Sequence, residues 1–160
     1  MAAGIRSAGM AVVCVAAVAA GQAVQQTPQT TLGVAGLINS APSLAVLDRT
    51  VVAVWSAAKD GAANVYIATS GDGGRSFSEA HRVNDVDGDA TANSEQPARA
   101  VISGRAGAHT ITVVWSKRND GPARSRRDVV RIARSTDGGR TFSPASSIHD
   151  AALSGARGWE

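Results

Sequence analysis

The chain of 160 residues repeats itself, and this repeat limits its possible folds more than any other feature. The segment Val54-Trp55-Ser56 recurs as Val114-Trp115-Ser116, and residues 70–78 (SGDGGRSFS) recur as residues 135–143 (STDGGRTFS). The matching segments follow one another in the same order in both copies, whereas the loops between them differ in length. Self-similarity of this kind is typical of architectures that stack one supersecondary unit on the next.

Each copy contains four short extended segments. We expect strands at residues 42–46, 51–56, 64–69 and 79–83 in the first copy, and at residues 97–102, 110–116, 129–134 and 144–149 in the second. Val51, Ala53 and Trp55 alternate with residues of the opposite face, which is the period of a strand. Both copies are therefore predicted to form a sheet of four consecutive strands.

The start of each copy shows a weaker match. Leu44-Ala45-Val46 is aligned with Arg99-Ala100-Val101, because both segments follow a proline. Consecutive strands joined by short turns form an antiparallel meander, and a repeated meander is typical of β-propeller blades. The sequence therefore predicts an all-β fold, an incomplete β-propeller. Its parts are two complete four-stranded blades and the start of a third, at residues 41–84, 96–150 and 151–160.

Composition agrees with a turn-rich β protein. Apolar residues make up 44% and charged residues 18% of the chain, which excludes a disordered charged tail. Aromatic residues are only 4%, so the core must consist largely of Val, Ile, Leu and Ala. The 17 glycines and 5 prolines indicate many turns. The net charge of +3 is too small to indicate a nucleic-acid partner.

The N-terminal residues 1–23 have the pattern of an export signal. Arg6 supplies a positive charge, an apolar run from Met10 to Ala20 follows, and small residues come after it. The run is too short to span a bilayer. We therefore predict a secreted or periplasmic protein that has no membrane contact after cleavage, with a linker at residues 24–40. The single cysteine, Cys14, lies within the signal, so the mature chain would have no disulfide, reactive thiol or thiolate-bound metal.

The longest match between the copies predicts a tight hairpin between the third and fourth strands. It has the form S-x-D-x-G-x-[ST]-[WF], and its members are Ser70, Asp72, Gly74 and Phe77 in the first copy and Ser135, Asp137, Gly139 and Phe142 in the second. Short Ser and Asp side chains accept hydrogen bonds from the backbone N–H groups of a turn. Glycine adopts positive φ without steric cost, and the aromatic ring can cover the turn.

This motif resembles the Asp-box, or bacterial neuraminidase repeat, of the sialidase superfamily. The resemblance covers residues 41–160 and rests on two boxes, each of which follows a V-x-I-A strand, Val65–Ala68 or Val130–Ala133. It implies that the chain is the N-terminal portion of an Asp-box β-propeller. It also implies that the boxes are structural elements and that a ligand binds at the opposite face of the propeller.

The loops of that opposite face are residues 57–63, 84–95 and 117–128, because alternate loops of a meander lie at the same end. The candidate ligand-face residues are Glu95, Arg118, Arg124, Arg126 and Arg127. Clustered cations can bind a carboxylate or a phosphate by charge-assisted hydrogen bonds, although such a loop can also be merely solvated. Because no aromatic residues alternate with these cations, we expect no nucleic acid to bind.

Three aspartates alternate in the segment 84–95, namely Asp85, Asp87 and Asp89, as at the start of a calcium loop. Ala90 and Gln96, however, stand where such a loop requires Gly and a bidentate Glu. We therefore expect a solvated connection between the blades, and neither a metal site nor a cofactor.

The resemblance implies a catalytic set of arginines, a Tyr–Glu pair and an Asp acid/base, and most of this set is missing. Ser40 and Glu95 stand where the first arginine would be in the two copies. Asp120 is the nearest match to the acid/base, with Asp60 as its counterpart, but an Asp-Gly turn explains both. Tyr66 lies inside a predicted strand. The three histidines, His81, His109 and His149, form no constellation in the sequence.

The sequence therefore predicts a secreted Asp-box propeller portion that binds a glycan or another extracellular polymer and has no complete active site. One alternative is the N-terminal part of an exo-α-sialidase, a glycoside hydrolase whose catalytic residues lie mainly beyond residue 160. Another is a purely structural module of an exported protein. The sequence does not predict the oligomeric state.

Overall fold

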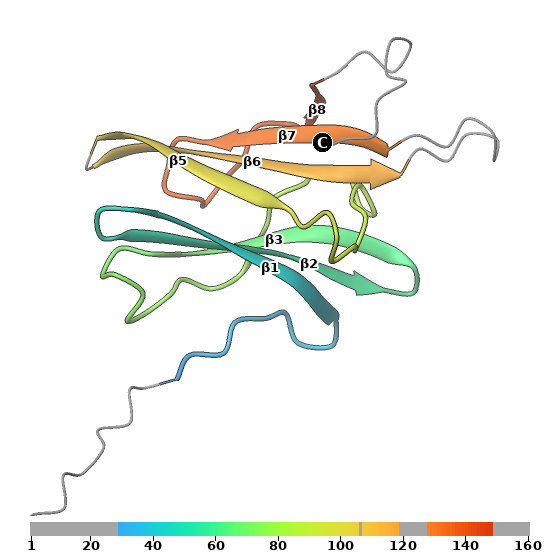
Figure 1. Cartoon of the computed structure of the whole chain (residues 1–160), viewed down its shortest axis with the longest axis horizontal. Coiled ribbons are helices and arrows are strands. Elements are labelled where there is room, and N and C mark those ends of the chain that lie inside the picture. The colour runs from blue at the N-terminus through green and yellow to red at the C-terminus, as the bar shows by residue number, and fades with distance from the viewer. Residues whose placement is uncertain (1–28, 106, 119–127, 149–160) are drawn as a thin grey trace, which may run out of the picture.

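The computed structural model describes residues 29–105, 107–118 and 128–148, which form two four-stranded antiparallel sheets (Figure 1). The first sheet has the strand order β1 (Ile38–Leu47), β2 (Thr50–Lys59), β3 (Ala62–Ser70) and β4 (His81–Arg82). The second has the order β5 (Arg99–Arg105), β6 (Ala108–Arg118), β7 (Asp128–Ser135) and β8 (Ser146–Ser147). The predicted all-β class is confirmed, and so is the meander order within each copy.

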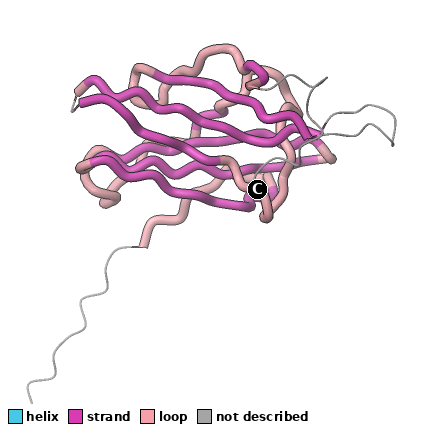
Figure 2. Tube along the Cα trace, turned by 45° about the horizontal axis from the view of Figure 1, so that its top comes forward, coloured by secondary structure: helices cyan, strands magenta, loops and turns pink. Residues whose placement is uncertain are grey.

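Strands and loops account for the whole described part of the chain (Figure 2). None of these residues forms a helix that is long and apolar enough to cross a membrane. The strands extend further than predicted wherever a tight hairpin allows pairing to continue. The pairing of β2 with β3 runs up to Lys59 and Ala62, around the turn Asp60-Gly61. Both turn residues have positive φ, 52° and 85°, as favoured by Asp-Gly in two-residue hairpins.

The predicted linker is partly wrong. Because β1 begins at Ile38, residues 38–40 belong to the first strand. Leu32, Val34 and Leu37 pack against Trp55 on one face of the first sheet, so this part of the predicted linker is also attached to the fold. Residues 24–28 lie outside the described part. The fourth strands were predicted to have five or more residues, but β4 and β8 have 2 residues each.

The two sheets stack face to face around one apolar core (Figure 1). Its most completely buried members are Val52, Val54, Val65 and Ile67 of the first sheet, and Ile111, Val113 and Trp115 of the second. Alternation in β2 explains this arrangement. Val52 and Val54 point toward the second sheet, whereas Ala53 and Trp55 point away from it.

The repeated tryptophans therefore occupy different environments. Trp115 lies between the sheets, whereas Trp55 lies on the face of the first sheet that points away from the second. The indole Nε1 of Trp55 donates a hydrogen bond to Asn39 Oδ1 at 2.9 Å, and residues 29–37 cover part of its ring. The Trp115 face of the second sheet packs on the face of the first sheet that does not carry Trp55. The two sheets are thus stacked through unlike faces.

The predicted alignment of the first strands is wrong by one residue. Leu44 pairs with Ala53, and Ala100 pairs with Val113, which is the counterpart of Ala53. Leu44 is therefore equivalent to Ala100 and not to Arg99. The alignment relied on Pro42, which lies within a β-bulge where the register of β1 shifts.

Candidate functional site

The two turns of the repeated S-x-D-x-G motif, called Asp-box turns after the sequence resemblance, lie at one end of the sheets and are held by their own side chains. Asp72 Oδ1 accepts hydrogen bonds from the backbone N–H groups of Arg75 and Ser76 at 2.9 and 3.0 Å. Asp72 Oδ2 accepts from Ser76 Oγ at 2.6 Å, and Ser70 Oγ accepts from the Gly74 N–H at 2.9 Å. The turn around Asp137 has the same set of bonds.

These bonds hold both box carboxylates in their ionised form. The hydrogen bond from the Ser76 hydroxyl is the main reason that the pKa of Asp72 lies far below its usual range. The Thr141 hydroxyl has the same effect on the pKa of Asp137. A carboxylate that is so strongly stabilised is a poor proton acceptor or donor at neutral pH. The hydrogen bonds of both box carboxylates thus lie within their own turns.

The second box also contacts the first sheet. Thr69 Oγ1 donates a hydrogen bond to the Gly138 carbonyl at 3.2 Å. Gly139 has a φ of 90°, and a Cβ atom at this residue would lie 2.9 Å from Thr69 Cγ2. Gly74, its counterpart, has a φ of 87° but much more space. Phe142 packs against the core between the sheets, whereas Phe77 packs against the Trp55 cluster.

The opposite end of the sheets carries a groove between the two sheets, with a volume of about 350 Å³. Its walls are largely small residues: Ala58, Gly61 and Ala63 from the first hairpin, Gly88, Ala90, Thr91 and Ala92 from the connection between the sheets, and Lys117 and Arg118 from β6. The groove is therefore lined by small residues and by two cationic ones.

Backbone hydrogen bonds fix the connecting segment between the two sheets. The Ala90 N–H donates to the Ala63 carbonyl at 3.2 Å, and the Thr91 N–H donates to the Ser116 carbonyl at 2.8 Å. Thr91 Oγ1 in turn accepts from the Arg118 N–H at 2.9 Å. This segment therefore joins β3 to β6 and forms the floor of the groove.

The loop 84–89 that leads into this segment is built from buried polar contacts. Asn84 Oδ1 accepts from the Val65 N–H at 2.8 Å, and Asn84 Nδ2 donates to Asn64 Oδ1 at 2.7 Å. Asp89 is only 1% exposed and pairs with two cations, Lys117 Nζ at 2.8 Å and Arg131 Nε at 2.9 Å. The prediction of a merely solvated connection is wrong for Asn84 and Asp89.

The three alternating aspartates diverge instead of converging on one point. Asp85 Oδ1 accepts from the Ala145 N–H at 3.2 Å, and this bond lowers the pKa of Asp85. Asp87 Oδ1 accepts from Asn64 Nδ2 at 2.9 Å, and Asp89 faces Lys117 and Arg131. Within the described residues, no cluster of His, Cys, Asp and Glu side chains could hold a metal ion.

The cations at the groove are not equally neutralised. Lys117 shares the buried carboxylate of Asp89 with Arg131, and Arg131 also interacts with the carboxylate of Asp85. Arg118 is exposed, and its Nε lies 4.0 Å from Asp128 Oδ1, at the limit of an ion pair. An exposed arginine whose ion pair is this long keeps guanidinium donors that can bind a carboxylate.

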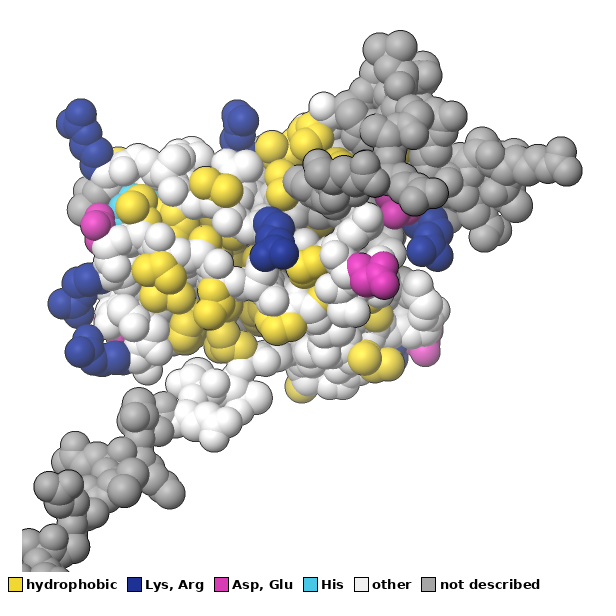
Figure 3. All heavy atoms as spheres, viewed as in Figure 1, with side chains coloured by type: hydrophobic (Ala, Val, Ile, Leu, Met, Phe, Trp, Pro, Cys, Tyr) yellow, Lys and Arg dark blue, Asp and Glu magenta, His cyan; other side chains and the backbone are white. Residues whose placement is uncertain are grey.

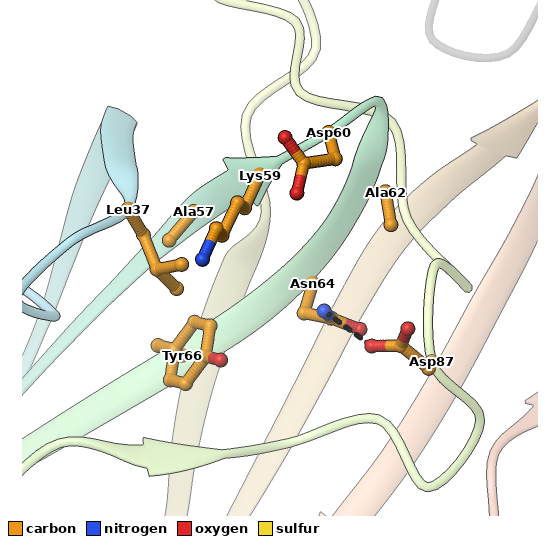
Figure 4. A pocket seen from close by; sticks show the side chains of 8 residues that line it. All are labelled: Leu37, Ala57, Lys59, Asp60, Ala62, Asn64, Tyr66 and Asp87. Atoms are coloured by element: carbon orange, nitrogen blue, oxygen red, sulfur yellow. Dashed lines mark hydrogen bonds between the residues drawn. The ribbon is translucent and has the colours of Figure 1, made fainter.

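A pocket of about 380 Å³ lies near the same end, on the tryptophan face of the first sheet (Figure 4). The Tyr66 ring stacks on Trp55, with centroids 6.3 Å apart and planes inclined by 24°. Figure 4 shows the Lys59 side chain reaching toward Leu37 and Tyr66, and its dashed bond joins Asn64 to Asp87. Asp60, a considered acid/base residue, and Tyr66 thus line the same pocket, with Lys59 between them in Figure 4.

The remaining predicted site residues are only partly placed. Arg118 lines the groove, whereas Glu95 is exposed beyond it, with its N–H donating to Asn93 Oδ1 at 2.9 Å. Other predicted residues lie outside the described part of the chain: Asp120, Arg124, Arg126, Arg127 and His149. His109 Nδ1 lies 3.2 Å from Thr50 Oγ1 at the Asp-box end, away from the groove.

No protein-family model matches this chain, and a search of the curated proteins finds no significant match. The groove lies among the loops that the sequence predicted for the ligand face, but Thr91, Gly61 and Gly88 were not among the candidate residues. The Asp60-Gly61 turn is the signal that could have drawn attention to the first hairpin.

Proposed function

We propose that this chain is part of a secreted Asp-box β-propeller that binds a carboxylate-bearing glycan and has no complete active site in this stretch. The observation that carries the proposal is the groove between the sheets, where Lys117 and Arg118 lie beside small residues and backbone. The guanidinium of Arg118 fits a sugar carboxylate, and walls of Gly and Ala leave space for the ring.

The propeller part of the proposal is supported by the way in which the two sheets stack. Propeller blades follow one another by rotation, so each blade contacts its neighbours through two different faces. The two sheets are meanders of the same order, are joined through unlike faces, and carry one Asp-box turn each at the same end. Secretion rests on the sequence pattern of residues 1–23, which lie outside the described part.

Titration calorimetry of the purified protein with sialyllactose and with lactose tests the binding proposal. We expect the acidic trisaccharide to bind, the neutral lactose to bind much more weakly, and added salt to weaken the binding of the acidic sugar. The variant Arg118→Gln should bind sialyllactose at least about tenfold more weakly.

Arg105→Gln is the matched control, because Arg105 is an exposed arginine at the end of β5, at the Asp-box end. It should leave the affinity unchanged. Equal binding of both sugars, or equal losses in the two variants, would contradict a carboxylate site in the groove.

An exo-α-sialidase portion is the second candidate. Asp60 and Tyr66 support it, because they bring a carboxylate and a phenol together in one pocket away from the boxes. An assay of the natural full-length protein on a fluorogenic sialoside tests this candidate. Turnover that is lost in Asp60→Asn would favour the enzyme, and an inactive protein that still binds sialyllactose would favour the binding module. A protein that does neither would be left as a structural module.

A further inference from the structure

The two sheets meet in one interface between unlike faces. Each of the two faces in that interface has an equivalent on the outside of the stacked sheets. In the interface, the Val54 face of the first sheet meets the Trp115 face of the second. Strand pairing makes Trp55 equivalent to Trp115, and Val114 equivalent to Val54. The Trp55 face of the first sheet and the Val114 face of the second point away from the interface. We call these the two outer faces.

Some apolar side chains are exposed on an outer face although the equivalent residue of the other sheet is covered in the interface. Leu44 on the outer face of the first sheet is 69% exposed, whereas its equivalent Ala100 packs against the core between the sheets. Val101 on the outer face of the second sheet is 61% exposed, whereas its equivalent Ala45 packs against that core. Exposed apolar side chains along β1 and β5 are visible in Figure 3.

Residues 29–37 cover the outer face of the first sheet only in part. Leu32 packs against the Trp55 cluster, but a groove of about 570 Å³ remains beside it, lined by Leu44, Ala53 and Trp55. This groove is mainly apolar, and it opens at the position where Ala100 is packed in the interface. The outer face of the first sheet thus keeps room for a further sheet.

The Tyr66 pocket marks another contact of the interface that the outer face could repeat. Tyr66 and Ala57, which line the pocket, are equivalent to Arg131 and Lys117. In the interface, Arg131 and Lys117 hold Asp89 of the preceding unit. The pocket therefore lies on the outer face at the position equivalent to the Asp89 contact.

A polar contact can also be repeated at the Asp-box end. In the interface, Thr69 donates to the Gly138 carbonyl at 3.2 Å. Arg134 of the second sheet is equivalent to Thr69 and is an exposed hydrogen-bond donor, and Gly73 of the first box is equivalent to Gly138. An arginine can donate to that carbonyl as a threonine does.

We propose that two copies of this chain associate head to tail, with the outer face of the first sheet of one copy on the outer face of the second sheet of the other. The partner is a second copy because the chain itself carries both complementary halves. Such a contact is heterologous, so it can continue to further copies or close into a ring. It leaves the groove of the proposed glycan site uncovered, and it does not depend on that function.

Light scattering after size-exclusion chromatography, over a range of concentrations, tests the association. The wild-type chain should form dimers or larger assemblies as its concentration rises. Val101→Glu and Leu44→Glu should each shift self-association at least about tenfold to higher concentration, because each places a carboxylate in an apolar contact. Val86→Glu is the matched control, since Val86 is 53% exposed in the loop 84–89, and it should associate as the wild type does.

A mixture of the two variants separates head-to-tail from face-to-face association. The Val101→Glu chain keeps an intact first outer face, and the Leu44→Glu chain keeps an intact second one, so an equimolar mixture should form a one-to-one dimer. A wild-type chain that remains monomeric at all concentrations would overturn the proposal. So would a Leu44→Glu variant that dimerises alone as well as the wild type, because like faces would then be in contact.

Discussion

At the scale of single residues, the Asp-box carboxylates are fixed by donors from their own turns. Asp72 and Asp137 each accept hydrogen bonds from two backbone N–H groups and two hydroxyls. All these donors favour the charged form of the carboxyl group. The turns should therefore respond to acid, while the chemistry of the groove should not depend on them.

The two carboxylates make the stability of the fold sensitive to acid. The pKa of both groups is lower in the folded chain than in the unfolded chain. Their stabilising effect is therefore complete above the unfolded pKa of about 4 and is lost as the pH falls toward the folded pKa. The melting temperature of the wild type should drop steeply below about pH 4. The melting temperature of the double variant Asp72→Asn/Asp137→Asn should be lower than that of the wild type at neutral pH and should fall less steeply as the pH is lowered. Parallel curves for the two proteins would contradict this role.

At the scale of elements, the loop 84–89 joins the two sheets. Asp89 supplies a buried carboxylate to Lys117 and Arg131 of the second sheet, and its carbonyl accepts a hydrogen bond from Trp115 Nε1 at 2.6 Å. Removing one partner of a buried ionic cluster leaves the other charges unpaired.

Asp89→Ala should lower the free energy of unfolding by about 3–5 kcal/mol. Asp87→Ala is the control, because the Asp87 side chain is 73% exposed and its ion pair with Arg82 and its hydrogen bond from Asn64 are each worth about 1 kcal/mol. Urea unfolding of the three proteins measures both effects. Similar small losses in the two variants would show that Asp89 does not hold the sheets together.

The sequence predicts the strands better than it predicts this loop. Alternation in β2 and β6, and the box motif, are local signals, so the strand order and the box turns could be read from the residues directly. The partners of Asn84 and Asp89 come from distant strands, so the same residues look like a solvated acidic loop in the sequence. Trp55 and Trp115 lie in different environments because of the way in which the sheets stack. No local sequence pattern predicts this stacking.

At the scale of the whole molecule, the two ends of the stacked sheets differ in character. One end carries two rigid turns whose carboxylates are fully engaged. The other carries the groove, where Arg118 and Lys117 lie beside small residues. The sequence resemblance implies a ligand at this second end, and we propose that the groove there binds a carboxylate-bearing glycan. Arg124, Arg126 and Arg127 follow in the sequence and add positive charge to the same loop.

Chemical-shift mapping with sialyllactose tests the proposed site most directly. Backbone amide signals of the isotope-labelled chain would be followed during a titration, with lactose as the neutral control. We expect saturable shifts for residues of the groove, chiefly Gly61, Gly88, Thr91 and Arg118, and little change at the Asp-box turns. Shifts that concentrate at the box end, or no shifts at millimolar sialyllactose, would contradict a carboxylate-bearing glycan site in the groove.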